Sequence, residues 1–442
     1  MRLDRRAFLS STIVLLGPMT ARAATPEAGE GYRLLAASRA EMALLAPPKP
    51  RTLANGFGGS VPGPLLRYKK GEDIKIRLVN ELAQPVTFSC QNTRIVNAMD
   101  GVGGLTQSPI LPGRSSDYRF APPDSGFYWY RSNAAPDARI DPGLYGPLII
   151  DEAEPPPVDR DLVLILGEWN LDAAAQIRSD PDKAGAGRPD HSIVTVNSTP
   201  GPVVMETLPG ARVRLRLLSM IGSQIAFVAF TGLRPLIAAI DGQPCVSFSP
   251  LRQTIPIGPG ACFDVICDLP PDAATSAVVT LRTGGTSQPL ATFAMRGTRR
   301  PPLPAFGSLP ANPLLPARID LQRSRKINLV VEDRHGALSL GGAAARTYAP
   351  EPLFSVRRGA PVTLSFTNKT PILLQAHVGG HALRILHDLD DGWDPYWRSN
   401  VIVSEGRAKH VAFVADNPGK WVIACQTLEP HPRCLVTWFE VS

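Results

Sequence analysis

Histidine is scarce in this 442-residue chain, which has seven in all and none before His191. Only the part of the chain from His191 onward can therefore supply imidazole ligands to a metal centre. Basic runs are also missing, since none is longer than two residues. The formal net charge of +7 falls to +4 without residues 1–23, which leave 42 basic and 38 acidic residues. This balance gives no support to a nucleic-acid-binding role.

Long apolar runs are absent as well, and the one that stands out, Ser10 to Gly17, is too short to span a bilayer. It follows Arg5-Arg6 and precedes a small-x-small cleavage site ending at Ala23. Residues 1–23 therefore resemble a twin-arginine export signal, with an ordinary secretory signal or a membrane anchor as the alternatives. We expect a periplasmic protein whose mature chain has no transmembrane segment.

The chain is rich in turn-forming residues, with 45 prolines and 38 glycines, and its length predicts two to four domains. One pattern occurs three times: apolar residues stand 3, 5 and 7 positions after Gly71, Gly210 and Gly359. A second pattern has apolar residues 5 and 7 positions after a glycine, and it follows each copy of the first, at Gly113, Gly260 and Gly406. Alternation with period two after a turn is typical of half-buried strands.

We therefore predict an all-β protein of three homologous β-sandwich domains, at 24–155, 156–300 and 319–442. A proline-rich linker at 301–318 separates the second from the third. Periodicity alone does not decide whether residues 30–46 form a short helix or an opening strand.

Six cysteines are present, and the expected compartment permits disulfides. Cys262 and Cys267 are an odd number of positions apart on a predicted strand, so they face opposite ways and should not pair. A local bridge between Cys425 and Cys434 is one open possibility, but the overall connectivity cannot be deduced.

Several short motifs, in order along the chain, resemble those of the three-domain multicopper oxidases. They are Asn55-Gly56, Val61 to Pro64, Asn80 to Pro85, Met99 to Gly101, Pro109 to Gly113, Gly126 to Tyr130, Gly143 to Pro147, Asp241 to Gln243 and Asn417 to Trp421. The resemblance implies that each domain is a cupredoxin-like Greek-key sandwich. It also implies a cluster of three copper ions held by eight histidines, and one further copper held by two histidines and a cysteine.

The positions that match those ligands have mostly lost them. The eight cluster positions fall on Ser89, Gln91, Arg131, Asn133, His377, Gly379, Ala424 and Gln426, and the mononuclear positions fall on Leu374, Cys425, Pro430 and the axial Leu435. Only His377 and Cys425 are retained. Arg131 argues most strongly against copper, because a permanently charged guanidinium repels a cation.

Two weaker hypotheses for metal binding remain, beside one simpler interpretation. His431 could act as a ligand shifted by one residue, which the change of strand face disfavours. A mononuclear metal site could form from imidazoles and carboxylates, namely His377, His381, His387, Asp388, Asp390 and Asp391. The simpler interpretation is that His381 is a packed histidine and Cys425 a buried apolar-like residue.

Within this family, the chain most resembles a copper-free type, the FtsP type, which supports cell division. We therefore predict a non-catalytic periplasmic scaffold or protein-binding factor with no cofactor, whose partners are periplasmic proteins, possibly of the septal machinery. The alternative is a copper-dependent oxidase or metal-handling protein with an atypical, reduced copper site.

Overall fold

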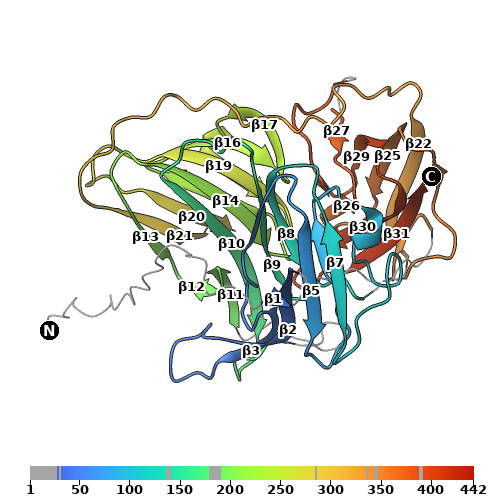
Figure 1. Cartoon of the computed structure of the whole chain (residues 1–442), viewed down its shortest axis with the longest axis horizontal. Coiled ribbons are helices and arrows are strands. Elements are labelled where there is room, and N and C mark those ends of the chain that lie inside the picture. The colour runs from blue at the N-terminus through green and yellow to red at the C-terminus, as the bar shows by residue number, and fades with distance from the viewer. Residues whose placement is uncertain are drawn as a thin grey trace.

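The computed structural model describes residues 27–28, 31–135, 141–178, 191–283, 286–334, 337–342, 347–387 and 392–442. These residues form six β-sheets, two in each of three successive parts of the chain (Figure 1). Helical structure is confined to two short 3-10 turns, η1 (Asn97–Met99) and η2 (Leu251–Gln253). No helix among the described residues is both long enough and apolar enough to cross a membrane.

The first sandwich pairs two sheets from the N-terminal third of the chain. One sheet contains β1 (Glu27–Ala28), β2 (Tyr32–Met42), β3 (Thr52–Phe57), β5 (Ile74–Asn80) and β7 (Ser115–Phe120). The other contains β4 (Leu66–Lys69), β6 (Ser89–Gln91), β8 (Gly126–Arg131) and β9 (Tyr145–Asp151). The open question about residues 30–46 is resolved as a strand, because β2 pairs in parallel with β5.

The second sandwich is the largest. Its first sheet contains β10 (Arg160–Leu171), β11 (His191–Val196), β12 (Thr199–Pro200), β14 (Arg212–Met220), β16 (Arg234–Ile240), β17 (Gln243–Phe248) and β19 (Cys262–Asp268). Its second sheet contains β13 (Val203–Thr207), β15 (Ala226–Thr231), β18 (Thr254–Ile257), β20 (Val278–Thr283) and β21 (Thr286–Met295).

The third sandwich repeats the arrangement. Its first sheet contains β22 (Arg325–Arg334), β23 (Ala337–Leu340), β25 (Ala360–Asn368), β27 (Arg384–Ile385) and β29 (Ala408–Ala415). Its second sheet contains β24 (Ser355–Val356), β26 (Leu374–Val378), β28 (Asn400–Val403), β30 (Gly419–Thr427) and β31 (Cys434–Val441).

The repeated sequence pattern corresponds to one repeated strand pair. The turn glycines Gly71, Gly210 and Gly359 have φ of +82°, +72° and +83°, a region that residues with a Cβ rarely adopt. Each precedes a strand, β5, β14 or β25, that pairs antiparallel with the strand of the second pattern, β7, β19 or β29. The alternating apolar residues of these strands point into the sandwich, so the predicted fold class is confirmed.

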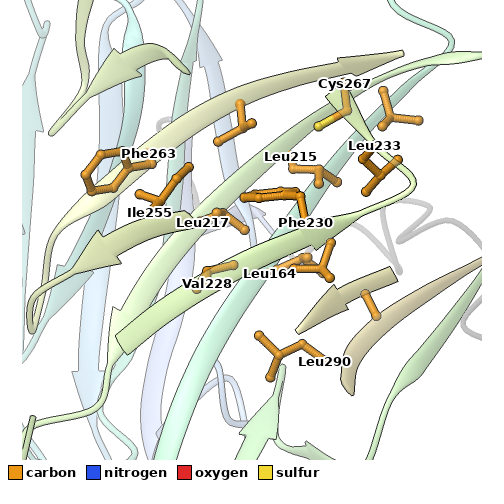
Figure 2. Packing of buried hydrophobic residues seen from close by; sticks show 14 of the residues in the cluster. Leu164, Leu215, Leu217, Val228, Phe230, Leu233, Ile255, Phe263, Cys267 and Leu290 are labelled. Atoms are coloured by element: carbon orange, nitrogen blue, oxygen red, sulfur yellow. The ribbon is translucent and has the colours of Figure 1, made fainter. Parts of the chain in front are cut away.

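Each sandwich is filled by its own apolar cluster. In the second one, Leu215 and Leu217 of β14 and Val265 and Cys267 of β19 meet Val228 and Phe230 of the facing sheet (Figure 2). The alternation of these residues accounts for the burial, since every second side chain of a strand points to the same face.

The proline-rich segment joins no sheet, but it is packed. Phe306 and Leu309 lie against the second sandwich, and Leu315 and Ile319 lie against the third. Asn312 donates to Ser125 O and to Gln243 Oε1, so the segment also touches the first sandwich.

Buried polar groups join the three sandwiches. Asp241 of the second accepts hydrogen bonds from the backbone N–H groups of Ser399 and Asn400 of the third, at 2.9 and 3.2 Å. Arg94 of the first forms ion pairs with Asp124 and with Asp416 of the third, at 2.8 and 2.9 Å. Because buried polar groups without partners destabilise a fold, these contacts fix the relative placement of the domains.

Candidate functional site

Four strands from two domains bring the predicted cluster positions together. Ser89 on β6 stands opposite Arg131 on β8, and His377 on β26 stands opposite Ala424 on β30. Seven of the eight positions line one cavity of about 30 Å³ between the first and third sandwiches: Ser89, Gln91, Arg131, Asn133, His377, Gly379 and Ala424. The eighth, Gln426, lines a separate cleft. Seven of the positions that the resemblance marked thus lie together in the fold.

The first-domain side of the cavity is internally hydrogen-bonded. Arg131 donates from Nη2 to Asn133 Oδ1 at 2.8 Å, and Gln91 donates from Nε2 to Ser89 Oγ at 2.8 Å. Residues two apart on a strand share a face, which is why each such pair can meet. The arrangement replaces two pairs of would-be ligands by two hydrogen-bonded side-chain pairs.

The third-domain side supplies a single imidazole. His377 Nδ1 lies 3.1 Å from Ser399 O, and since a carbonyl only accepts, Nδ1 carries the proton. Burial, aided by the Arg131 charge, lowers the pKa of His377 to about 4, so the ring is neutral at pH 7. Gly379 and Ala424 offer no donor atoms.

Asp100 is a cavity residue to which sequence reasoning gave no role. It is 6% exposed, and its Oδ2 has no hydrogen-bond partner among the described residues. Burial raises the pKa of Asp100 to about 7, while the Arg131 guanidinium opposes the rise. The available signal was the Met99 to Gly101 motif, which carried the family resemblance.

The mononuclear positions have become part of an apolar core. Leu374, Cys425 and Leu435 are each 3% exposed or less and belong to the central cluster of the third sandwich. Burial raises the pKa of the Cys425 thiol to about 12, whereas copper binds the thiolate. The remaining position, Pro430, is exposed.

These donors do not fit copper. A copper site is built from imidazole and thiolate ligands. The cavity offers one imidazole, beside a fixed positive charge, and the thiol of Cys90, whose pKa burial raises so that the thiolate is disfavoured. Within the described ranges, no three His, Cys, Asp or Glu side chains are grouped so that they could hold a metal ion.

The other histidines do not converge with His377. His381 is 3% exposed and packs against the rings of Phe413, Trp421 and Phe439, as expected for a packed histidine. Of the acids proposed with it, Asp388, Asp390 and Asp391 lie outside the described residues. His431 lies in a loop, so the strand-face argument against it does not apply. It lines the separate cleft, away from the cavity.

The disulfide considered between Cys425 and Cys434 is not formed in this structure, in which all six cysteines are free thiols. Cys425 pairs with Leu435 and Gln426 pairs with Cys434, so the two thiols point to opposite faces of one sheet. Cys262 and Cys267 also face opposite ways, as predicted, and they belong to different apolar clusters.

The comparisons with known proteins agree on one family. Two family models described as multicopper oxidase match residues 42–155 and 319–442. The multicopper oxidase MmcO of Mycobacterium tuberculosis is 26% identical over 482 residues, covering 96% of this chain and 94% of that protein. Copper resistance protein A of Pseudomonas syringae is 36% identical over 121 residues, which are 27% of this chain and 20% of that protein.

Solved structures agree. A multi-copper oxidase from Pseudomonas thermotolerans superposes with a TM-score of 0.80 at 27% identity, covering 92% of this chain and 98% of that one. Lac15, from a marine microbial metagenome, gives 0.77 at 28%, covering 92% and 99%. The chain belongs to the multicopper oxidase superfamily and has its three cupredoxin-type domains.

Proposed function

We propose that this protein is a copper-free member of the superfamily that acts by binding, as a periplasmic scaffold or protein-binding factor. The observation that supports it most is the former cluster cavity. Seven ligand positions line that cavity, yet Arg131 and Asn133 bind each other, as do Gln91 and Ser89, and only His377 keeps an imidazole.

A second candidate is an oxidase or metal-handling protein with a reduced copper site. It is favoured by the names of the relatives, which are oxidases and copper resistance proteins. Within this chain it would depend on the two retained ligand types, His377 and Cys425. Their surroundings oppose it, because one lies beside Arg131 and the other is packed among leucines.

Copper stoichiometry distinguishes the two. The full chain is loaded with copper and desalted, and its metal content and visible spectrum are measured beside those of His377→Gln and Cys425→Ser. The proposal predicts the same background copper in all three proteins and no blue absorption band. One or more tightly held coppers in the native chain, lost in either variant, would establish the second candidate instead.

The periplasmic address is part of the proposal and has its own test. Arg5→Lys with Arg6→Lys is expected to retain the protein in the cytoplasm, whereas a secretory-pathway protein would still be exported. Cross-linking in intact cells is then expected to recover periplasmic proteins, with septal components as the predicted class. Recovery of none above the level of an unrelated exported protein argues against the scaffold role.

A further inference from the structure

A cleft lined by described residues lies where all three domains meet. It has a volume of about 640 Å³, in the range of pockets that hold small organic ligands. Its walls include Arg39 and Gln84 of the first domain, Trp169 and Met220 of the second, and Gln426 and His431 of the third. The cleft is distinct from the cavity of about 30 Å³ described above.

The acids of the cleft are already saturated by the protein. Glu168 accepts from the backbone N–H groups of Gly222 and Ser223, both at 3.1 Å, and from Ser223 Oγ. Asp141 accepts from Gly143 N at 3.0 Å and also from the side chains of Asn55 and Gln84.

The cleft wall also contains a positively charged side chain, that of Arg39. Arg39 is exposed on β2, where its backbone pairs with β3, and its side chain makes no ion pair or hydrogen bond with another residue in the described part of the chain. Its position in the cleft wall places a guanidinium with five available N–H donors beside the pocket. A carboxylate, sulfonate or phosphate matches that donor pattern.

Polar side chains, among them Arg178 and His431, share the rest of the wall with an apolar and rigid part. Five prolines line the cleft: Pro85, Pro142, Pro259, Pro430 and Pro432. Proline loses almost no side-chain freedom when it is covered, so an apolar body can bind against these rings without ordering long side chains.

We propose that this cleft binds an organic anion, with an apolar body against the proline walls and one acidic group at Arg39. The inference deepens the proposed function, on which it rests, by giving a binding protein a ligand site. It requires no copper and no redox step.

A matched pair of dyes tests it. 1-Anilinonaphthalene-8-sulfonate carries an acidic group, and N-phenyl-1-naphthylamine has the same ring system without it. In fluorescence titrations of the full chain we expect one saturable site for the anion, weakened about 2- to 5-fold by Arg39→Gln, the range for an exposed ion pair. Binding of the neutral dye should not change in that variant.

Two further variants locate the site. Ala135 is exposed in the cleft wall, so Ala135→Trp fills the cleft without disturbing a core and should abolish binding of the anion. Arg282→Gln removes an exposed arginine from β20, outside the cleft lining, and should leave binding unchanged. Near-ultraviolet circular dichroism verifies that each variant is folded.

The inference is overturned if the anion fails to saturate, if Ala135→Trp leaves its affinity intact, or if Arg39→Gln weakens both dyes equally. These outcomes are separate from the copper measurement. A copper-free chain that binds no anion loses only this inference, whereas a copper-loaded chain overturns the proposed function whatever the dyes do.

Discussion

Replacing Asp100 by asparagine is expected to stabilise the protein at pH 8 and to have little effect at pH 4. The carboxyl group is buried, its Oδ2 has no hydrogen-bond partner among the described residues, and burial raises its pKa to about 7. Asparagine has nearly the shape of the protonated acid and cannot ionise. The variant therefore removes only the penalty for charging a buried group.

The sign and size follow from the two pKa values. In the unfolded chain an aspartate titrates near 3.9, about three units below its folded value. Between about pH 4 and 7 the folded state holds a proton that the unfolded state has released, so stability falls as the pH rises through this window. At 1.36 kcal/mol per unit the whole loss is about 4 kcal/mol, of which about 3 kcal/mol lies above pH 5.

Thermal unfolding of both proteins at pH 5 and pH 8 measures the effect. His377 and His381, whose pKa values burial lowers to about 4, make stability rise between about pH 4 and 6.5, but they are common to both proteins and cancel in the difference. Asp117→Asn is a control that should destabilise the protein at both pH values. The hydrogen bond from Arg77 lowers the pKa of Asp117, so its charged form stabilises the folded state. The reasoning fails if Asp100→Asn gains no stability relative to the native protein between pH 5 and pH 8.

Three further predictions concern buried groups. Iodoacetamide should leave Cys425 unmodified in the folded protein, because burial raises its pKa to about 12, and mass spectrometry after unfolding should show it fully reactive. Leu435→Ala should cost about 2–5 kcal/mol in unfolding experiments, whereas the volume-conserving Leu435→Met should cost less than about 1.5 kcal/mol and add no copper to the purified protein. Glu152→Gln should cost about 1.5–3 kcal/mol by calorimetry, because Arg214, 2% exposed at the junction of the first two domains, loses its bidentate charged partner but keeps Asp264; an unchanged transition would refute this.

The fold was predictable because its signals are local. A glycine that must adopt positive φ, followed by apolar residues at fixed odd offsets, determines both a turn and the buried face of a strand. This holds equally at Gly71, Gly210 and Gly359. The cluster cavity was predictable for a related reason, since the spacing of positions along β6, β8, β26 and β30 carries over from the family.

What the sequence did not reveal depends on contacts between distant segments. The raised pKa of Asp100 arises from burial between two domains, and no local pattern indicates it. The cleft around Arg39 combines residues from 39 to 434, and Arg39 itself belongs to none of the motifs. Whether Cys425 and Cys434 can form a disulfide depends on the register of β30 against β31. Counting residues along the chain does not give that register.

Losing copper ligands and keeping the fold are physically compatible here. An unpaired polar group left in a buried cavity is destabilising, so isolated losses of histidine would weaken the domain junction. The replacements avoid this in two ways: the first-domain positions hydrogen-bond in pairs, and Leu374 and Leu435 fill the mononuclear site with apolar volume. The interdomain contacts at Asp241 and Arg94 involve none of these positions, so the proposed copper-free state is compatible with the three-domain arrangement. A binding function is therefore open to this chain even though the donors for copper are gone.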